Sequence, residues 1–237
     1  MGLQAVILVG GLGTRLRDIV KDRPKPLALI NGRPFLEYQI AFLKKHNIRD
    51  IVLCIGYQGE KIEEYFSDGI KHGVSIRYSR EKELLGTGGA IKNARNLLGK
   101  RFFVLNGDTL FLTDLYKMLN FHLQSSADVT IALTKTPDQT RYGSVTINDN
   151  SRITDFQEKM QLHNSFINAG TYLFETDSFD WGELHEVFSL EKDLLPKLVR
   201  TGNIYGFVDD CYFVDMGTAE GYRKLETDLL HGNISIM

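Results

Sequence analysis

Apolar runs and helical patterns alternate along the first half of the chain. Uninterrupted apolar runs such as residues 5–9 and 102–105 are typical of strands buried on both faces of a sheet. Between the runs, apolar side chains recur at helical spacing, as at Leu36, Ile40 and Leu43. This alternation predicts a parallel sheet covered by helices. Strands are predicted at 5–9, 51–55, 74–78, 102–105 and 129–133, and helices around 36–44, 62–66, 89–98 and 115–123.

The pattern changes after about Thr134, where strand-like segments follow one another more closely. Strands are predicted at 143–147, 152–156 and 167–174, and helical spacing returns at 190–199 and 220–230. No linker rich in proline, glycine or serine separates the two halves. We therefore expect one continuous α/β domain over residues 1–237, with a strand-rich second part.

Composition narrows the class of protein. The chain has 237 residues, of which 43% are apolar and 24% charged, as in an ordinary globular domain. The formal net charge of −2 gives no basic field that would attract nucleic acid. No apolar run approaches the ~20 residues that cross a bilayer, and no secretory leader is evident. Cys54 and Cys211 are predicted to be free thiols, and the protein is expected in the cytoplasm.

A glycine-rich loop, residues 10–16, directly follows the first predicted strand. Ligands of α/β sheets bind at the carboxyl ends of strands, and glycines let backbone amides approach a phosphate closely. Arg15 adds a permanently charged donor for phosphate oxygens. A tight turn with an exposed arginine fits the same residues, so the loop alone leaves both interpretations open.

Two well-known phosphate loops do not fit these glycines. The dinucleotide fingerprint needs a third glycine three residues after Gly13, where the chain has Leu16, and the Gly-Lys-Ser/Thr end of the P-loop is absent. The second predicted strand ends in Ile55-Gly56-Tyr57, without an acidic residue for a ribose. An NAD-binding oxidoreductase is therefore disfavoured.

Three further residues are candidates for chemistry. Lys25 lies between Pro24 and Pro26, which stiffen the backbone on both sides of its charge. Asp108 and Asp215 each follow an apolar run, so that two carboxylates at strand ends could share one Mg²⁺ ion. Taken singly, each aspartate also fits a turn or a helix cap, and the lysine fits a solvated proline turn.

A series of short motifs closely resembles those of the sugar-1-phosphate nucleotidylyltransferases. Each motif is weak alone, but their ordered combination is highly specific and covers residues 3–222, nearly the whole chain. The motifs are Gly10–Leu16, Pro24-Lys25-Pro26, Leu85–Ala90, Asn106-Gly107-Asp108, Glu158-Lys159, Asn168-Ala169-Gly170 and Asp215–Thr218.

This resemblance implies a doubly wound α/β fold of the Rossmann-like nucleotidyltransferase type, with a mostly parallel mixed sheet. It also implies transfer of a nucleotidyl group to a sugar 1-phosphate, with Mg²⁺ or Mn²⁺ as cofactor. Residues 1–134 would mainly bind the nucleotide, and 135–237 the sugar phosphate. Neither nucleic acid nor a membrane is an expected partner, and a homo-oligomer stays open.

The resemblance also assigns site residues. Arg15, Lys25 and Asp108 would be catalytic, and Asp108 and Asp215 would hold the metal ion. Arg15 would bind the β and γ phosphates, Lys25 the α phosphate and Lys159 the sugar phosphate. The nucleotide would contact Leu8, Gly10, Gly11, Gly13, Thr14, Arg15, Lys25, Glu81, Gly86, Thr87 and Asp108. The sugar phosphate would contact Tyr142, Gly143, Glu158, Lys159, Asn168 and Gly170. A non-catalytic regulatory module is the alternative, and the retained charged residues argue against it.

Within this family the chain most resembles the short bacterial guanylyltransferases that act on D-glycero-D-manno-heptose 1-phosphate and yield GDP-heptose. Its compact length and the segments 141–143, 188–191 and 210–215 carry that likeness. Two departures are Arg17-Asp18-Ile19, in place of Pro-Leu-Thr, and Met160, in place of a proline. The alternatives are a mannose-1-phosphate guanylyltransferase and a uridylyl- or thymidylyltransferase of the same family.

The implied reaction needs no general base. Its nucleophile is a phosphate oxygen, and a phosphate monoester with a second pKa near ~6 is largely dianionic at neutral pH. All six histidines lie outside the motifs, which agrees with this chemistry. What remains for the protein is to position two anions and to stabilise the leaving pyrophosphate.

Glu81 is the candidate for recognition of the base. In the family, the residue five positions before the glycine of the Leu-Gly-Thr motif reads the base edge, and counting back from Gly86 gives Glu81. An ionised carboxylate only accepts hydrogen bonds, which suits the adjacent N1–H and amino group of guanine. Uracil would set a carbonyl against it, at a cost of about 1–3 kcal/mol. The sequence thus favours GTP over UTP or dTTP, unless Glu83 or backbone groups read the base.

Overall fold

A nine-stranded mixed sheet forms the middle of the computed structural model, which describes residues 2–11, 13, 23–136, 141–158 and 165–236. Its strand order is β10-β9-β11-β6-β1-β4-β5, and β8 pairs with β11 and β12 beside this path. The strands are β1 (Gln4–Leu8), β4 (Asp50–Ile55), β5 (Ser75–Arg80), β6 (Arg101–Asn106), β8 (Val129–Thr134), β9 (Ser144–Ile147), β10 (Ile153–Gln157), β11 (Phe166–Glu175) and β12 (Ile204–Val208).

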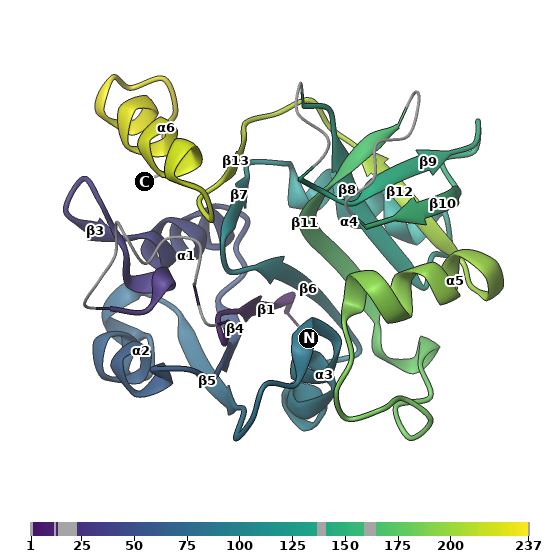
Figure 1. Ribbon diagram of the computed structural model, residues 1–237, viewed down its shortest axis with the longest axis horizontal. Coiled ribbons are helices and arrows are strands. Elements are labelled where there is room, and N and C mark those ends of the chain that lie inside the picture. Colours follow the sequence, from purple (N-terminus) through teal and green to yellow (C-terminus); the bar gives the residue numbers. More distant parts are fainter. Residues whose placement is uncertain (1, 12, 14–22, 137–140, 159–164, 237) are drawn as a thin grey trace.

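Two small sheets and the helices complete the fold (Figure 1). β2 (Leu29–Ile30) pairs with β3 (Arg33–Pro34), and β7 (Thr109–Phe111) pairs with β13 (Phe213–Asp215). The α-helices are α1 (Phe35–Lys45), α2 (Gly59–Phe66), α3 (Gly86–Ala94), α4 (Leu115–Gln124), α5 (Leu195–Thr201) and α6 (Ala219–Leu230). Short helical turns are η2 (Lys25–Leu27), η3 (Ile70–His72), η4 (Arg95–Leu97), η5 (Thr176–Ser178) and η6 (Leu190–Leu194), the last being a π-helical turn.

Helices cover both faces of the large sheet, because alternate residues of its strands point to opposite sides. In β1, Ala5 and Ile7 pack in a core with the apolar faces of α1, α2, α4 and α6. Val6 points the other way, into a second core with residues of α3, η6 and α5. The strands β1, β4 and β6 are therefore buried on both faces, which is why the sequence shows unbroken apolar runs there, whereas the edge strand β5 is partly exposed. The predicted doubly wound α/β class is confirmed.

The direction of the strands changes at β6. This strand is parallel to β1 on one edge, and β1, β4 and β5 continue the parallel order. On its other edge β6 is antiparallel to β11, which begins the antiparallel part with β8 and β9. The strand-rich second half predicted from the sequence thus extends the same sheet. The short strands β2, β3, β7 and β12 were not predicted.

Both cysteines are free, as predicted. Cys54 is fully buried in β4, and Cys211 is partly exposed. Burial raises the pKa of the Cys54 thiol well above its usual range and that of Cys211 to about 12, so both stay protonated at neutral pH. Among the described helices, none is both long and apolar enough to cross a membrane.

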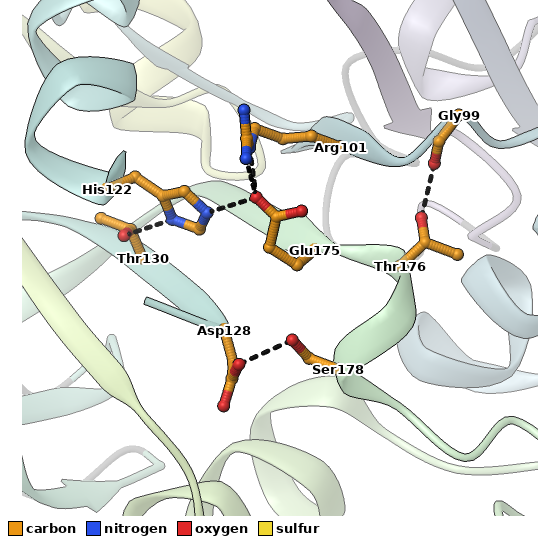
Figure 2. A network of polar contacts seen from close by, with 8 residues as sticks. All are labelled: Gly99, Arg101, His122, Asp128, Thr130, Glu175, Thr176 and Ser178. Carbon is orange, nitrogen blue, oxygen red and sulfur yellow. Dashed lines mark hydrogen bonds and ion pairs between the residues drawn. The ribbon is translucent and has the colours of Figure 1, made fainter. Parts of the chain in front are cut away.

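A polar network inside the second half ties α4 to β6, β8 and β11 (Figure 2). Its centre is His122, which is 1% exposed. The Nε2 atom of His122 lies 3.4 Å from Glu175 Oε1, and Nδ1 lies 2.8 Å from Thr130 Oγ1. Arg101 forms an ion pair with the same carboxylate. Because a carboxylate can only accept, Nε2 carries the proton of the neutral ring and Nδ1 accepts from the Thr130 hydroxyl.

Burial lowers the pKa of His122, since desolvation of the charged ring outweighs the attraction of Glu175. The unfolded chain, with an ordinary pKa near about 6.5, therefore takes up a proton more readily than the folded protein. The stability that neutral His122 contributes is fully present above that value and is lost as the pH falls through the lowered folded pKa.

We predict that the free energy of unfolding decreases between pH 7 and pH 5.5, and that His122→Gln flattens this decrease. At pH 7 the variant should be less stable by about 1–2 kcal/mol, because one buried hydrogen bond is lost. Urea unfolding at four pH values measures both effects, with the exposed His231→Gln as control. An unchanged slope in His122→Gln would contradict the assignment of the proton uptake to this residue.

Candidate active site

The carboxyl ends of β1 and β6 border a cavity of about 400 Å³. Thirteen residues predicted from the sequence line it: Leu8, Gly10, Gly11, Glu81, Gly86, Thr87, Asp108, Tyr142, Gly143, Glu158, Asn168, Gly170 and Asp215. Gly13 and Lys25 line an adjoining cavity of about 460 Å³, which shares Leu8, Gly11, Leu84, Gly86, Gly107 and Asp108 with the first. Thr14, Arg15 and Lys159 lie outside the described residues. The structure thus brings residues from both halves of the chain to one place.

Close backbone contacts form one end of this cavity. The Gly107 amide donates to the Leu8 carbonyl at 3.0 Å, and a Cβ atom on Gly107 would lie 2.3 Å from that oxygen. A Cβ atom on Gly56 would lie 2.8 Å from the Gly10 carbonyl oxygen. Side chains at Gly56 or Gly107 would push the loops that follow β1, β4 and β6 apart. Glycine is therefore required at both positions.

Lys25 and Asp108 form an ion pair at the side of the adjoining cavity. The Lys25 ammonium lies 2.7 Å from Asp108 Oδ2, and the two side chains are 11% and 28% exposed. Lys25 begins η2 directly after Pro24, and Pro26 follows it, so the backbone that carries the charge is stiff. The pair holds a cation and a carboxylate in a fixed relation without taking either fully out of water.

Asp215 is brought to Asp108 by the small sheet. Asp215 is opposite Thr109 in the β13–β7 pair, and the next amide, Met216 N, donates to the Asp108 carbonyl at 2.8 Å. Asp215 is 7% exposed, and its Oδ1 accepts from the Gly217 amide at 2.7 Å. A Cβ on Gly221 would lie 1.9 Å from the Asp215 carbonyl oxygen, so α6 can pack here only with glycine. The second carboxylate therefore comes from the small sheet, not from the large one.

The donor set of the cavity fits a hard cation such as Mg²⁺. Asp108 and Asp215 both line it, and its described lining contains neither histidine nor cysteine. Within the described part of the chain, no group of three or more metal-ligating side chains is found. Two carboxylates suit Mg²⁺, which usually keeps water and phosphate oxygens as its other ligands.

Glu81 follows β5 and lies beside the first glycine of the loop. Its Oε2 accepts from the Leu85 amide at 3.2 Å, and its Oε1 lies 2.8 Å from where a Cβ of Gly10 would be. Burial raises the pKa of Glu81, although the hydrogen bond from Leu85 works in the opposite direction. The carboxylate is thus oriented by the backbone and partly withdrawn from water in the cavity wall.

β11 contributes the side of the cavity opposite the glycine loop. The backbone N–H of Asn168 donates to the Gly143 carbonyl at 2.8 Å, and this bond joins the two segments that carry the predicted sugar-binding residues. Gly170 has a φ of +70°, and a Cβ there would lie 2.7 Å from Thr109 Oγ1 and 2.9 Å from Asn106 Nδ2. Glu158 Oε2 is 3.2 Å from where a Cβ of Gly143 would be. Side chains at positions 143 and 170 would therefore crowd the neighbouring residues of this wall.

Seven lining residues were not among the predicted contacts: Leu84, Ala90, Asn106, Gly107, Thr109, Arg141 and Glu191. Asn106 and Gly107 belong to a motif that drew attention to Asp108 alone, and Arg141 and Glu191 lie in segments noted for resemblance without a role. Thr109 is the first residue of the unpredicted strand β7, so no pattern marked it.

The glycines at the start of α3 contact another segment of the protein. A Cβ on Gly88 would lie 2.1 Å from Phe188 Cε2, and one on Gly89 would lie 2.3 Å from the Glu186 carbonyl oxygen. The Gly88 and Gly89 amides both donate to the Phe188 carbonyl, at 3.1 and 3.2 Å. Residues 186–189 therefore pack directly on the first turn of α3, and this brings Glu191 to the cavity.

Comparisons with known proteins show similar sequences and a similar fold. The family model described as "Nucleotidyl transferase" matches residues 4–232. The D-glycero-alpha-D-manno-heptose 1-phosphate guanylyltransferase of Aneurinibacillus thermoaerophilus is 45% identical over 97% of this chain and 99% of its own length. The protein of the same name from Campylobacter jejuni is 42% identical over 93% of this chain and 97% of its own. The crystal structure of HddC from Yersinia pseudotuberculosis complexed with GMP-PN has a TM-score of 0.85 at 34% identity, covering 96% of this chain and 100% of that one.

The contact between α3 and residues 186–189 predicts an unusual effect of an alanine. In a helix, Gly→Ala normally stabilises by up to about 1 kcal/mol. Gly89→Ala should instead destabilise the protein by about 1–3 kcal/mol, because the new methyl group meets the Glu186 backbone. Urea unfolding measures the change, and Gly99→Ala, whose Cβ would lie 3.8 Å from its nearest neighbour, is the control. A stabilised Gly89→Ala would contradict the packing described here.

Proposed function

The chain belongs to the nucleotidyl transferase family, and from this premise we propose that it transfers a guanylyl group from GTP to a sugar 1-phosphate, releasing pyrophosphate. The proposed sugar substrate is D-glycero-α-D-manno-heptose 1-phosphate, on which the two relatives named above act by their names. The product would be GDP-heptose, an activated sugar for glycan synthesis. Both substrates are highly charged metabolites, so the proposal keeps the cytoplasmic location expected from the sequence.

The observation that carries the choice of GTP is Glu81 in the cavity wall. Its Oε2 is held by the Leu85 amide, and a carboxylate oxygen with one partner can accept a second hydrogen bond. The two oxygens together match the adjacent N1–H and amino group of guanine. The pyrimidine bases of UTP and dTTP would place a carbonyl against one of them. A Cβ at position 10 would lie 2.8 Å from Oε1, so glycine there lets the carboxylate lie against the loop.

The charged residues then account for the reaction. The phosphate of the sugar is the nucleophile, and it attacks the α-phosphorus of GTP while the bond to pyrophosphate breaks. In our proposal Lys25 moves part of its interaction from Asp108 to the α-phosphate, where negative charge grows. Arg15 would hold the leaving pyrophosphate and Lys159 the sugar phosphate, as the resemblance implies. No side chain has to remove a proton from a phosphate that is already ionised.

Asp108 and Asp215 are the proposed ligands of Mg²⁺ or Mn²⁺. When bound, the metal ion would neutralise phosphate oxygens and favour their alignment. This role is supported by the placement of the two carboxylates in one cavity, close to the cation of Lys25. Glu158, Asn168, Gly170, Tyr142 and Gly143 would form the sugar subsite, in agreement with their position on the second half of the chain.

Pyrophosphate release with four nucleotides and a panel of sugar 1-phosphates tests the function. We expect GTP with D-glycero-α-D-manno-heptose 1-phosphate to give the highest kcat/KM, and mannose 1-phosphate, which shares the ring hydroxyls, to rank next. Glu81→Gln should lower kcat/KM for GTP by about 10- to 100-fold, which corresponds to about 1–3 kcal/mol, and narrow the advantage over UTP. Burial raises the pKa of Glu81, so its carboxylate should take up a proton at acid pH and the preference for GTP should weaken there.

The matched control for this variant is Glu83→Gln, which removes a neighbouring exposed carboxylate that does not line the cavity. A wild-type preference for UTP would overturn the guanylyltransferase proposal. If Glu83→Gln and not Glu81→Gln changed the nucleotide preference, only the assignment of the base-reading residue would be wrong.

The metal proposal makes its own prediction. Asp108→Asn and Asp215→Asn should each reduce turnover at least about 100-fold at low Mg²⁺, because the loss of one carboxylate weakens binding of the ion. Both variants should keep the melting temperature of the wild type within a few degrees. Asp114→Asn is the control and should retain activity. Asp114 caps α4, a role that asparagine can also fill, and it does not line the cavity. Near-normal rates of both site variants at low Mg²⁺ would refute the shared-metal assignment.

A further inference from the structure

Glu191 is a cavity residue to which neither the sequence motifs nor the family resemblance gives a role. It lies in η6, two residues after the segment that packs on α3, and it lines the cavity together with Thr87, Glu158 and Asn168. The carboxylate therefore stands where the nucleotide-binding and sugar-binding halves of the lining meet. What it does there can be argued from its hydrogen bonds.

Three hydroxyl groups hold the Glu191 carboxylate in place. Its Oε2 accepts from Thr87 Oγ1 at 2.6 Å and from Ser189 Oγ at 3.0 Å. Its Oε1 accepts from the Tyr172 hydroxyl at 3.3 Å. A carboxylate has about four lone-pair sites on its two oxygens. Within the described part of the chain, the more loosely engaged oxygen is therefore Oε1.

The hydroxyl groups of Thr87 and Tyr172 also accept hydrogen bonds, and these further bonds agree with donation to Glu191. The Leu190 amide donates to Thr87 Oγ1 at 2.8 Å, and Asn168 Nδ2 donates to the Tyr172 hydroxyl oxygen at 2.7 Å. Each hydroxyl thus already accepts, and its own proton points to Glu191. Burial, together with the negative charge of Glu191, raises the pKa of Tyr172 well above its usual range, so this donor stays protonated. The hydroxyl protons of Thr87, Ser189 and Tyr172 thus orient Glu191 as a hydrogen-bond acceptor.

The side-chain amide of Asn168 belongs to the same network. Its Nδ2 holds Tyr172, and its Oδ1 accepts from the Gly170 amide at 3.0 Å. Asn168 therefore positions the Tyr172 hydroxyl and the backbone at Gly170. Beside Glu158 and Asn168, Glu191 adds a carboxylate whose orientation this network sets, and a sugar hydroxyl donates well to a carboxylate.

We propose that Glu191 binds a hydroxyl group of the sugar 1-phosphate through Oε1, with Thr87, Ser189 and Tyr172 as the residues that position it. This inference rests on the proposed function, since it names a contact of the same sugar subsite. It also gives Thr87 a second role, because its hydroxyl links the start of α3 to the acceptor. Recognition of the sugar then depends on the packing of residues 186–189 against Gly88 and Gly89.

The test compares wild-type enzyme with Glu191→Gln, which keeps the size of the side chain and the acceptor for Thr87 and Ser189. We expect KM for the sugar phosphate to rise about 10-fold or more, while KM for GTP and the melting temperature change little. Glu186→Gln is the matched control, because Glu186 lies on the same segment, pairs with Lys92 and does not line the cavity. It should leave both KM values within about twofold of wild type.

A series of substrate analogues separates a direct contact from a structural effect. Mannose 1-phosphate and its four monodeoxy analogues, at positions 2, 3, 4 and 6, are measured as competitive inhibitors against the heptose 1-phosphate. One deoxy analogue should bind wild type at least about 10-fold more weakly than mannose 1-phosphate, and that penalty should nearly vanish in Glu191→Gln. Each penalty is the ratio of two inhibition constants measured on the same enzyme. A general loss of affinity in the variant therefore cancels when the penalties of the two enzymes are compared.

Equal deoxy penalties in wild type and Glu191→Gln, for all four positions, would overturn the inference. So would a variant in which KM for GTP and the melting temperature change together while sugar discrimination is kept, because that result marks a purely structural residue. If the wild type released no pyrophosphate from GTP with any sugar 1-phosphate, the proposed function itself would fail. If the wild type is active and Glu191→Gln matches it, only the role of Glu191 fails.

Discussion

The site depends on the two neighbours of β6, one of which runs parallel to it and the other antiparallel. Its parallel partner β1 ends at the same side as β6, so the glycine loop and Asn106-Gly107-Asp108 meet there. Its antiparallel partner β11 starts at that side, so Asn168 and Gly170 arrive beside the same end. One strand therefore brings together segments more than a hundred residues apart. The close contact of Gly107 with Leu8 then fixes how near the two loops lie.

Much of this fold could be predicted from the sequence, because burial on both faces leaves unbroken apolar runs and the helices show their spacing. The order of the strands could not, since periodicity tells which residues are buried and not against what they pack. β7 has only three residues, too few for a pattern, yet its pairing with β13 brings Asp215 to Asp108. β12 pairs with β8 at the side of the large sheet, and Gly206 in its middle weakens the strand pattern in the sequence.

In the site, too, sequence motifs identified some residues, whereas contacts between distant segments became evident only from the structure. The motifs marked residues such as Lys25, which lies between two prolines, and Glu81, which was found by counting back from Gly86. They assigned Gly86 and Thr87 to the nucleotide and gave Gly88 and Gly89 no role. In the structure Gly88 and Gly89 accommodate residues 186–189, a contact across about a hundred residues of sequence. Glu191 escaped notice because its three partners are hydroxyl groups on separate elements, which no spacing along the chain can reveal.

Charge balance explains why such a cavity needs cations from several sources. Its described lining carries five carboxylates, Glu81, Asp108, Glu158, Glu191 and Asp215, and one guanidinium, that of Arg141. In the proposed reaction a triphosphate and a phosphate monoester enter this negative environment, and repulsion between unit charges a few ångströms apart amounts to about 4 kcal/mol near a protein surface. Lys25 offsets one charge where it pairs with Asp108. A divalent ion between Asp108 and Asp215 would offset two more at the reacting phosphates. In the same proposal, Glu81 and Glu191 would lie away from the phosphates and accept hydrogen bonds from neutral donors on the base and the sugar. The negative charge that repels phosphate at these two places would then favour one orientation of each substrate.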